Sequence, residues 1–203
     1  TVSPAKFIPI AEDARLIGPI GEWVLRTACK EAAKWPATVR VAVNVSAEQL
    51  HDNSFASTVV SALAQAGLDP NRLEVEVTES VFMHEGTHAV AVLDKILAMG
   101  VRLALDDFGT GYSSLSYLKM LPVQQLKIDQ SFVSGIGKSQ GDEAIICSVM
   151  ALAQSLGFEV VAEGVETEEQ AAFLRHLGCQ KLQGYLHGRA VAPAEFRARW
   201  SIR

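Results

Sequence analysis

Residues 87–107 read THAVAVLDKILAMGVRLALDD, and the fold prediction depends on the pattern in this stretch. Apolar residues recur at helical spacing from Thr87 to Met99, and Gly100 follows at once, which is the usual way for a helix to end. Val101–Leu105 is then a short, continuous apolar run typical of a buried strand. The stretch therefore predicts a helix, a glycine stop and a strand of a parallel sheet.

The same order recurs along the chain. A helix, a glycine and a strand in repeated succession are typical of βαβ units, and near-continuous apolar strands indicate that both faces of the sheet are covered. The predicted helices are Asn53–Ala66, Thr87–Met99, Asp142–Leu156 and Thr167–Leu177. The predicted strands are Val39–Val43, Leu73–Val77, Val101–Leu105, Val123–Leu126, Glu159–Ala162 and a weak one near Lys181-Leu182.

Two architectures fit this order, an open doubly wound sheet and a closed barrel. Each predicted strand ends in a polar residue, and successive ones lie 20 to 36 residues apart. In an open sheet, residues at opposite edges could not converge, whereas in a barrel all carboxyl ends open on one mouth. We therefore predict an α/β fold of the modified TIM-like (β/α) barrel type, formed as a single domain over residues 1–203.

A full barrel needs more strands than the six found here, so we expect N-terminal strands before Thr1. Ser3 followed by Pro4 also predicts that the sequence begins at a helix, inside a longer protein.

Composition limits the function classes. The net charge of -5 argues against a broad nucleic-acid surface, so we expect no nucleic-acid polymer as a partner. No signal peptide is visible, and no apolar run reaches the roughly 18 residues that span a bilayer. We expect a cytoplasmic domain, free or attached to a membrane anchor elsewhere in the protein. The three cysteines lack metal-ligand spacing and are predicted to be buried reduced thiols.

The polar strand ends include four carboxylates and one amide. Like charges that meet at one barrel mouth raise each other's pKa unless a cation intervenes, and hard oxygen ligands suit Mg²⁺ or Mn²⁺. A carboxylate pair could bridge two such ions about 4 Å apart, as in phosphodiester cleavage. The predicted ligands are Asn44, Glu76, Asp106, Asp107 and Glu163.

Two adjacent aspartates need a bent chain if both are to bind metal. Successive strand residues point to opposite faces, so Asp106 and Asp107 can share one site only where the backbone turns. We expect Gly109 and Gly111 to supply that freedom.

Other interpretations stay open for several of these residues. A single acidic strand end is commonly a helix cap or an ion-pair partner. Lys127 could neutralise carboxylates or orient an attacking water, and Gln183 could cap backbone groups or bind a base edge. Glu79 could be a local cap, or it could hold the loop at residues 109–112.

The strand ends, taken in order, resemble the EAL family of cyclic di-GMP phosphodiesterases. The resemblance covers nearly the whole chain, including Ser3-Pro4 with Phe7-Ile8-Pro9. It rests on the motifs Asn44-Val45-Ser46, Glu76-Val77-Thr78-Glu79-Ser80, Asp106-Asp107-Phe108-Gly109-Thr110-Gly111, Lys127-Ile128-Asp129, Glu163-Gly164-Val165-Glu166 and Gln183-Gly184-Tyr185.

The resemblance implies a modified barrel that hydrolyses cyclic di-GMP to linear 5′-pGpG with two Mg²⁺ or Mn²⁺ ions. It implies that Lys127 contacts the hydrolytic water, that Glu79 steadies the loop after Asp107, and that Gln183 acts near the substrate or water. It also implies that the protein is a homodimer with a sensory or GGDEF-type domain N-terminal to this one. Asp129, Gln183, Tyr185 and Gln49 are the predicted substrate contacts.

One departure from the family leaves the function open. The Glu-Ala-Leu motif, whose glutamate is a metal ligand, would precede Ser3 and is not in this sequence. The first hypothesis is an active phosphodiesterase. The alternative is a catalytically inactive cyclic di-GMP receptor, and a third is a metal-dependent barrel enzyme that acts on another phosphodiester.

Overall fold

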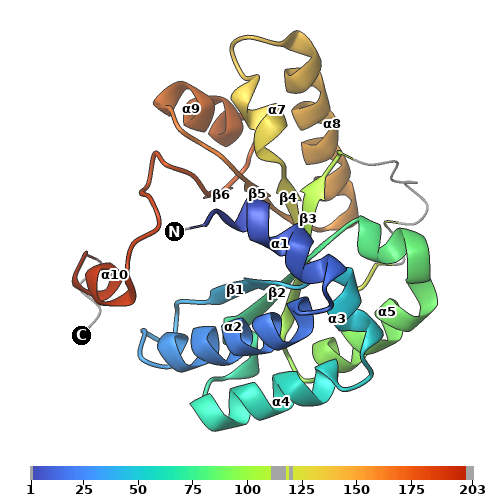
Figure 1. Cartoon of the computed structure of the whole chain (residues 1–203). Coiled ribbons are helices and arrows are strands. Elements are labelled where there is room, and N and C mark those ends of the chain that lie inside the picture. The colour runs from blue at the N-terminus through green and yellow to red at the C-terminus, as the bar shows by residue number, and fades with distance from the viewer. Residues whose placement is uncertain (1, 111–117, 119–120, 200–203) are drawn as a thin grey trace. The chain divides into compact units, whose positions relative to one another are not determined.

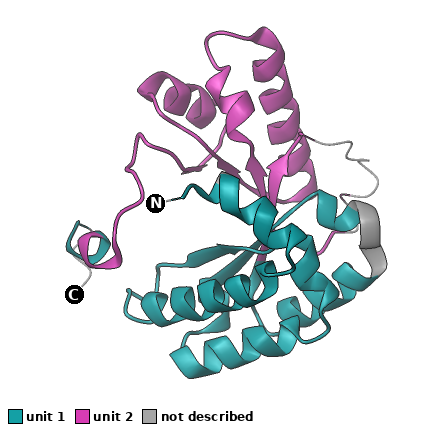
Figure 2. Cartoon of the chain, viewed as in Figure 1, with its two compact units in different colours: residues 1–102, 196–203 teal, residues 103–195 magenta. Residues whose placement is uncertain are grey.

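The computed structural model describes residues 2–110, 118 and 121–199, apart from the side chains of residues 5 and 83–87. Within it the chain forms two compact units (Figure 2). Unit 1 comprises Thr1–Arg102 and Phe196–Arg203, and unit 2 comprises Leu103–Glu195.

Unit 1 combines two parallel strands with helices. Its strands β1 (Val41–Asn44) and β2 (Leu73–Thr78) pair in register, with Val41 opposite Leu73 and Asn44 opposite Glu76. Its helices are α1 (Pro4–Asp13), α2 (Ile17–Ala32), α3 (Ala47–His51), α4 (Phe55–Ala66), the 3₁₀ helix η1 (Pro70–Arg72) and α5 (Ser80–Ala98).

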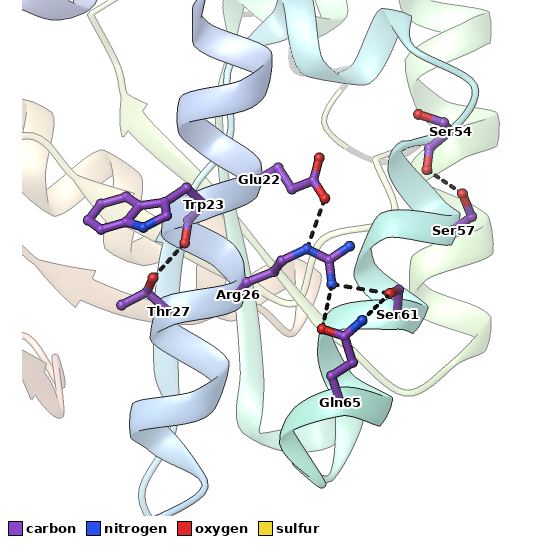
Figure 3. A network of polar contacts seen from close by, with 8 residues as sticks. All are labelled: Glu22, Trp23, Arg26, Thr27, Ser54, Ser57, Ser61 and Gln65. Atoms are coloured by element: carbon purple, nitrogen blue, oxygen red, sulfur yellow. Dashed lines mark hydrogen bonds and ion pairs between the residues drawn. The ribbon is translucent and has the colours of Figure 1, made fainter.

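Two arginines link elements of unit 1, one from a half-exposed position and the other from a buried one. Helices α2 and α4 lie side by side (Figure 1), and the half-exposed Arg26 of α2 bonds Ser61 and Gln65 of α4 at 3.1 and 3.0 Å (Figure 3). Arg72, by contrast, is buried and donates to the carbonyls of Ala32, Val39 and Trp35 at 2.6, 2.9 and 3.2 Å. Arg72 therefore satisfies the backbone between α2 and β1.

Unit 2 contains consecutive parallel strands with helices after them. Strand β3 (Arg102–Phe108), whose first residue still belongs to unit 1, pairs with β4 (Gln125–Ile128), β4 with β5 (Glu159–Ala162), and β5 with β6 (Lys181–Leu182). The helices are α7 (Gln130–Ser134), α8 (Gln140–Leu156), α9 (Glu168–His176) and α10 (Pro193–Arg199), which crosses into unit 1. Helix α8 contacts both β4 and β5 (Figure 1).

All six predicted strands occur, and every pairing above is parallel, as predicted. The predicted glycine stops are also found: Gly67 and Gly157 cap α4 and α8 with left-handed φ values of 64° and 75°. Consecutive buried residues such as Leu103, Ala104 and Leu105 confirm that strands are covered on both faces.

Some predicted boundaries are wrong. Helix α5 begins at Ser80 rather than Thr87, because Val81 and Phe82 bury their side chains and outweigh the cost of Gly86 inside a helix. Cys29 and Cys179 are buried free thiols as predicted, whereas Cys147 is exposed on α8. Among the described residues, no helix is long and apolar enough to cross a membrane.

Candidate metal centre

The two adjacent aspartates of β3 lie at an irregularity in the strand. The register between β3 and β4 shifts between Leu105 and Phe108, and Asp107 has a left-handed φ of 53°. The backbone N–H of Asp107 donates to Oδ1 of Asp106 at 3.0 Å. Because a bulge re-aims a side chain, it removes the strict alternation that would send the two carboxylates to opposite faces.

The backbone bends at the two aspartates as predicted, but the bend does not start at the glycines that were expected to supply it. It begins at Asp107 itself, whereas Gly109, with a φ of 97°, comes two residues later. Gly111 lies outside the described residues. Aspartate is one of the few residues besides glycine that enters the left-handed region, because its short side chain can bond locally.

Three carboxylates and one ammonium group meet in unit 2. Single oxygens of Asp106, Asp107 and Glu163 all lie within 4.8 Å of one another. Lys127 of β4, whose side chain is 3% exposed, places Nζ 3.1 Å from Oδ1 of Asp106 and 2.7 Å from Oε1 of Glu163. Four of the predicted site residues are thus neighbours, although they are up to 57 positions apart in the sequence.

The electrostatics of the cluster favour an additional cation. Burial, and then the charges of Asp106, Asp129 and Glu163, raise the pKa of Asp107 to about 6. Burial also raises the pKa of Glu163, and the hydrogen bond and charge of Lys127 only partly oppose this shift. One lysine therefore does not neutralise the cluster. Closely spaced carboxylate oxygens of this kind fit a hard divalent cation such as Mg²⁺ or Mn²⁺.

The other two predicted ligands belong to unit 1. Asn44 ends β1 and is exposed, and its register partner Glu76 in β2 is buried. The backbone N–H of Val45 donates to the Glu76 carbonyl at 2.9 Å, which fixes the end of β1 against β2. The pairing thus places an amide and a carboxylate on neighbouring strands.

Glu79 stands at the N-cap of α5, yet its side chain makes no cap hydrogen bond. This observation argues against the alternative that Glu79 is merely a local cap. Its predicted support of the loop at residues 109–112 involves residues 111 and 112, which lie outside the described residues.

The predicted substrate contacts of unit 2 have different surroundings. Asp129 caps α7 and accepts from the backbone N–H of Ser131 at 2.9 Å; burial raises its pKa, but bonds from Ser131 and Gln130 outweigh burial and lower it. Gln183 and Tyr185 are exposed, and the Arg189 guanidinium lies 4.2 Å from the centre of the Tyr185 ring. Both exposed side chains are accessible to a ligand.

Gln49 is buried and serves the backbone. It completes a capping box with Ser46, whose backbone N–H donates to Oε1 of Gln49 at 3.2 Å. The same side chain fills the space beside Gly21, where an added Cβ would meet it at 2.1 Å. Gln49 also lines a cavity of about 390 Å³ in unit 1, next to Glu48, Asp52 and Phe55. Its predicted substrate contact stays a prediction.

One buried polar residue of unit 2, whose side chain bonds the loop after Glu163, was not predicted. Gln170 is 7% exposed and completes a second capping box with Thr167. The pattern Thr-x-x-Gln before a helix is a sequence signal for such a box and could have identified it.

Comparisons with known proteins point to one family. The model of the EAL domain matches residues 1–190. MucR of Pseudomonas aeruginosa, a bifunctional diguanylate cyclase/cyclic di-GMP phosphodiesterase, is 45% identical over 198 residues, which cover 96% of this chain and 29% of MucR. The chain spans about a quarter to a third of the length of the curated relatives it matches.

Solved structures extend the likeness to the fold. The PaMucR phosphodiesterase in complex with c-di-GMP superposes with a TM-score of 0.93 and 43% identity, over 96% of this chain and 81% of that chain. A manganese and cyclic di-GMP complex of BlrP1 from Klebsiella pneumoniae gives a TM-score of 0.76 and 33% identity, over 83% and 43% of the chains. The α/β, TIM-like barrel fold class is therefore confirmed, and the chain belongs to the EAL domain family.

Proposed function

We propose that this chain is a phosphodiesterase domain that hydrolyses cyclic di-GMP to linear 5′-pGpG with divalent metal ions. The observation that carries the proposal is the group of three carboxylates with the buried Lys127 between two of them. Relatives of the same family are named as cyclic di-GMP phosphodiesterases.

Two Mg²⁺ or Mn²⁺ ions are the proposed cofactors. Asp106, Asp107 and Glu163 would hold them, and Asn44 and Glu76 are the further proposed ligands. When bound, such ions lower the pKa of a water molecule and stabilise the charge on the leaving oxygen.

Lys127 has a role that follows from its position. Its ammonium is held by Asp106 and Glu163, so its orientation is fixed before substrate binds. A fixed cation can orient a water molecule and stabilise negative charge that develops on the phosphoryl group. We assign Glu79 to loop support, Gln183 to the substrate or water, and Asp129, Tyr185 and Gln49 to substrate binding.

The proposed setting is a longer signalling protein. MucR combines a diguanylate cyclase with a phosphodiesterase by name, which fits a GGDEF-type or sensory domain N-terminal to this one. We further propose a homodimer in the cytoplasm, with cyclic di-GMP as the ligand and no nucleic-acid polymer as a partner.

The test compares turnover and binding in the full-length protein. Incubation with cyclic di-GMP and Mn²⁺ or Mg²⁺ should give pGpG, whereas EDTA or Asp106→Asn should abolish the product. Binding of cyclic di-GMP without turnover, unchanged by EDTA, would identify a receptor instead. Equal turnover of cyclic di-GMP and a generic phosphodiester would contradict the proposed substrate.

A further inference from the structure

The loop between β5 and α9 carries Glu163, and one buried side chain, that of Gln170, bonds to the loop backbone at two positions. Oε1 of Gln170 accepts from the backbone N–H groups of Glu166 and Thr167 at 2.8 and 3.1 Å. Nε2 of the same amide donates to the Val133 carbonyl at 3.2 Å. Gln170 thus does more than cap its own helix, because its second end reaches α7.

Helix α7 follows the strand that carries Lys127. Asp129 is the N-cap of α7 and comes two residues after Lys127, while Val133 lies in the last turn of this short helix. Helices α7 and α9 lie side by side in unit 2 (Figure 1). The Gln170 amide therefore joins the segment after β4 to the segment after β5. Lys127 lies in β4, just before the first segment, and Glu163 begins the second, and their side chains meet at 2.7 Å.

A second contact joins the same two segments. Gly164 has a left-handed φ of 67°, and a Cβ added there would lie 2.5 Å from Cβ of Gln130, the first residue of α7. On its other side the loop is held by the backbone bond from Val165 N–H to the Gln183 carbonyl at 3.0 Å. The residue that follows Glu163 is thus packed directly against α7.

We propose that Gln170 is a positioning residue of the metal centre, which fixes Glu163 relative to Lys127 by tying the β5–α9 loop to α7. The inference rests on the proposed function, since it takes Glu163 as a metal ligand. A buried amide with all three bonds satisfied is costly to replace, because each partner loses a hydrogen bond and the bond to the Val133 carbonyl is buried.

Two substitutions distinguish the hydrogen bond from Gln170 to α7 from the hydrogen bonds by which Gln170 caps α9. Gln170→Met keeps the length of the side chain but removes every bond. Gln170→Glu keeps an oxygen for the two loop N–H groups, and glutamate is a favourable residue at this position of a capping box, but it removes the donor to the Val133 carbonyl. The added negative charge of Gln170→Glu would by itself favour a cation, so weaker metal binding in this variant cannot come from charge.

Ser139→Ala is the matched control. Ser139 caps α8 by accepting from the Asp142 N–H at 3.2 Å, so this variant loses one helix-cap hydrogen bond without touching the Glu163 loop. It shows what a general loss of stability does to metal binding.

The readout is Mn²⁺ affinity of the full-length protein, measured by titration calorimetry together with the melting temperature. We expect both Gln170 variants to bind Mn²⁺ about tenfold more weakly, as is typical when an outer partner of a metal ligand is lost, and Ser139→Ala to bind it like wild type. Wild-type affinity in Gln170→Met, or weakening in Ser139→Ala as large as in Gln170→Met, would overturn the inference. Absence of Mn²⁺ binding in wild type would instead overturn the proposed function.

Discussion

At the scale of single residues, Asp107 combines an unusual backbone with a shifted pKa. Burial and the neighbouring charges of Asp106, Asp129 and Glu163 raise the pKa of this carboxyl to about 6 in the metal-free protein. Between its ordinary pKa and this value, the folded protein binds more protons than the unfolded one. The metal-free protein therefore loses stability as pH rises across that range, and a bound cation would offset the loss.

We expect Mn²⁺ to raise the melting temperature more at about pH 7.5 than at about pH 5, because below its pKa of about 6 the Asp107 carboxyl is protonated and the proton competes with the ion. Thermal unfolding at a fixed Mn²⁺ concentration measures the difference. It should shrink in Asp107→Asn, and equal stabilisation of wild type at both pH values would contradict the prediction.

Lys127 is a buried cation between two carboxylates, so its loss should lower the stability of the protein as well as its activity. In Lys127→Met, Asp106 and Glu163 lose the ammonium that lies between them, and breaking a buried ion pair in this way typically costs about 3–5 kcal/mol. We expect a lower melting temperature without metal, a larger recovery by Mn²⁺ than in wild type, and no turnover.

Lys181→Met is the control for Lys127→Met. Lys181 pairs with Glu159 at 2.7 Å and donates to Oε1 of Gln125 at 2.8 Å, but its side chain is 40% exposed, so its loss should cost less than that of Lys127. A Lys127→Met protein as stable as Lys181→Met would mean that burial does not determine how much the ion pair contributes to stability.

The carboxylate cluster was predictable from the sequence, but its supports were not. Asp106, Lys127 and Glu163 follow apolar runs, and the βαβ order alone indicated that such ends share one side. The bulge at Asp107 has no sequence signal comparable to a glycine. The pattern at Thr167–Gln170 predicts a capping box, yet nothing local indicates that the amide also reaches Val133, 37 positions away.

At the scale of elements, two glycines with similar left-handed φ values differ in what surrounds them. Gly157 ends α8 with a φ of 75° and has open space where a Cβ would stand, whereas Gly164 has a similar φ of 67° but lies against Gln130. Both substitutions to alanine incur the cost of the left-handed conformation, about 1–2 kcal/mol. Only Gly164→Ala also forces α7 and the Glu163 loop apart.

We therefore expect Gly157→Ala to lower stability by about 1 kcal/mol, with Mn²⁺ affinity unchanged. Gly164→Ala should lose a further 1–3 kcal/mol or so from the steric overlap and should also bind Mn²⁺ more weakly. Urea unfolding and Mn²⁺ titration of the two variants provide the comparison. Equal losses of stability would show that the approach to Gln130 relaxes without cost.

The boundaries of strands were less predictable than their existence. Val123 and Gln124 belong to the predicted strand, but the ladder begins at Gln125. The Gln124 backbone still bonds the Leu103 carbonyl and the Glu159 N–H, both at 3.0 Å, whereas the Leu103 N–H donates to a side-chain oxygen, Oε1 of Gln124, at 2.9 Å. Apolar content predicts burial, whereas it does not predict which backbone groups are paired with side chains.

Two arginines of unit 1 test how burial changes the amount that an arginine's hydrogen bonds contribute to the stability of the protein. Arg72→Met would leave the carbonyls of Ala32, Val39 and Trp35 without this donor, and we expect a loss of about 3 kcal/mol or more. Arg26→Met removes a half-exposed ion pair with Glu22 and two bonds to α4, and should cost less than about 1 kcal/mol. Chemical denaturation measures both, and the reverse order would contradict the argument.

At the scale of the whole molecule, the order of strands and helices was enough to predict the fold class. The choice of a barrel over an open sheet came from the polar strand ends, and structures of the EAL family confirm it. The sequence did not predict that Phe196 contacts Trp35, which lies shortly after α2. That contact joins positions 161 residues apart, through the rings of Trp35 and Phe196 with centroids 5.1 Å apart, and periodicity carries no information on such a distance.

The two compact units raise the question of whether the chain unfolds as one domain, as predicted. Domain boundaries normally fall in exposed, flexible linkers. Here one boundary follows Arg102, the first residue of β3, and the other precedes Phe196, inside α10. Both boundaries fall inside regular elements rather than in a linker.

We therefore expect a single calorimetric transition, with equal calorimetric and van't Hoff enthalpies. Phe196→Ala, which removes the ring contact with Trp35, should lower the midpoint of that whole transition. Hydrogen exchange should report the same loss of protection in β4 and β5 of unit 2 as in β2 of unit 1, although the substitution lies in unit 1. Ile145→Ala, at an exposed position of α8, is the control and should leave the midpoint nearly unchanged. Two transitions, of which Phe196→Ala moves only one, would contradict the prediction, because they would mean that the units fold independently.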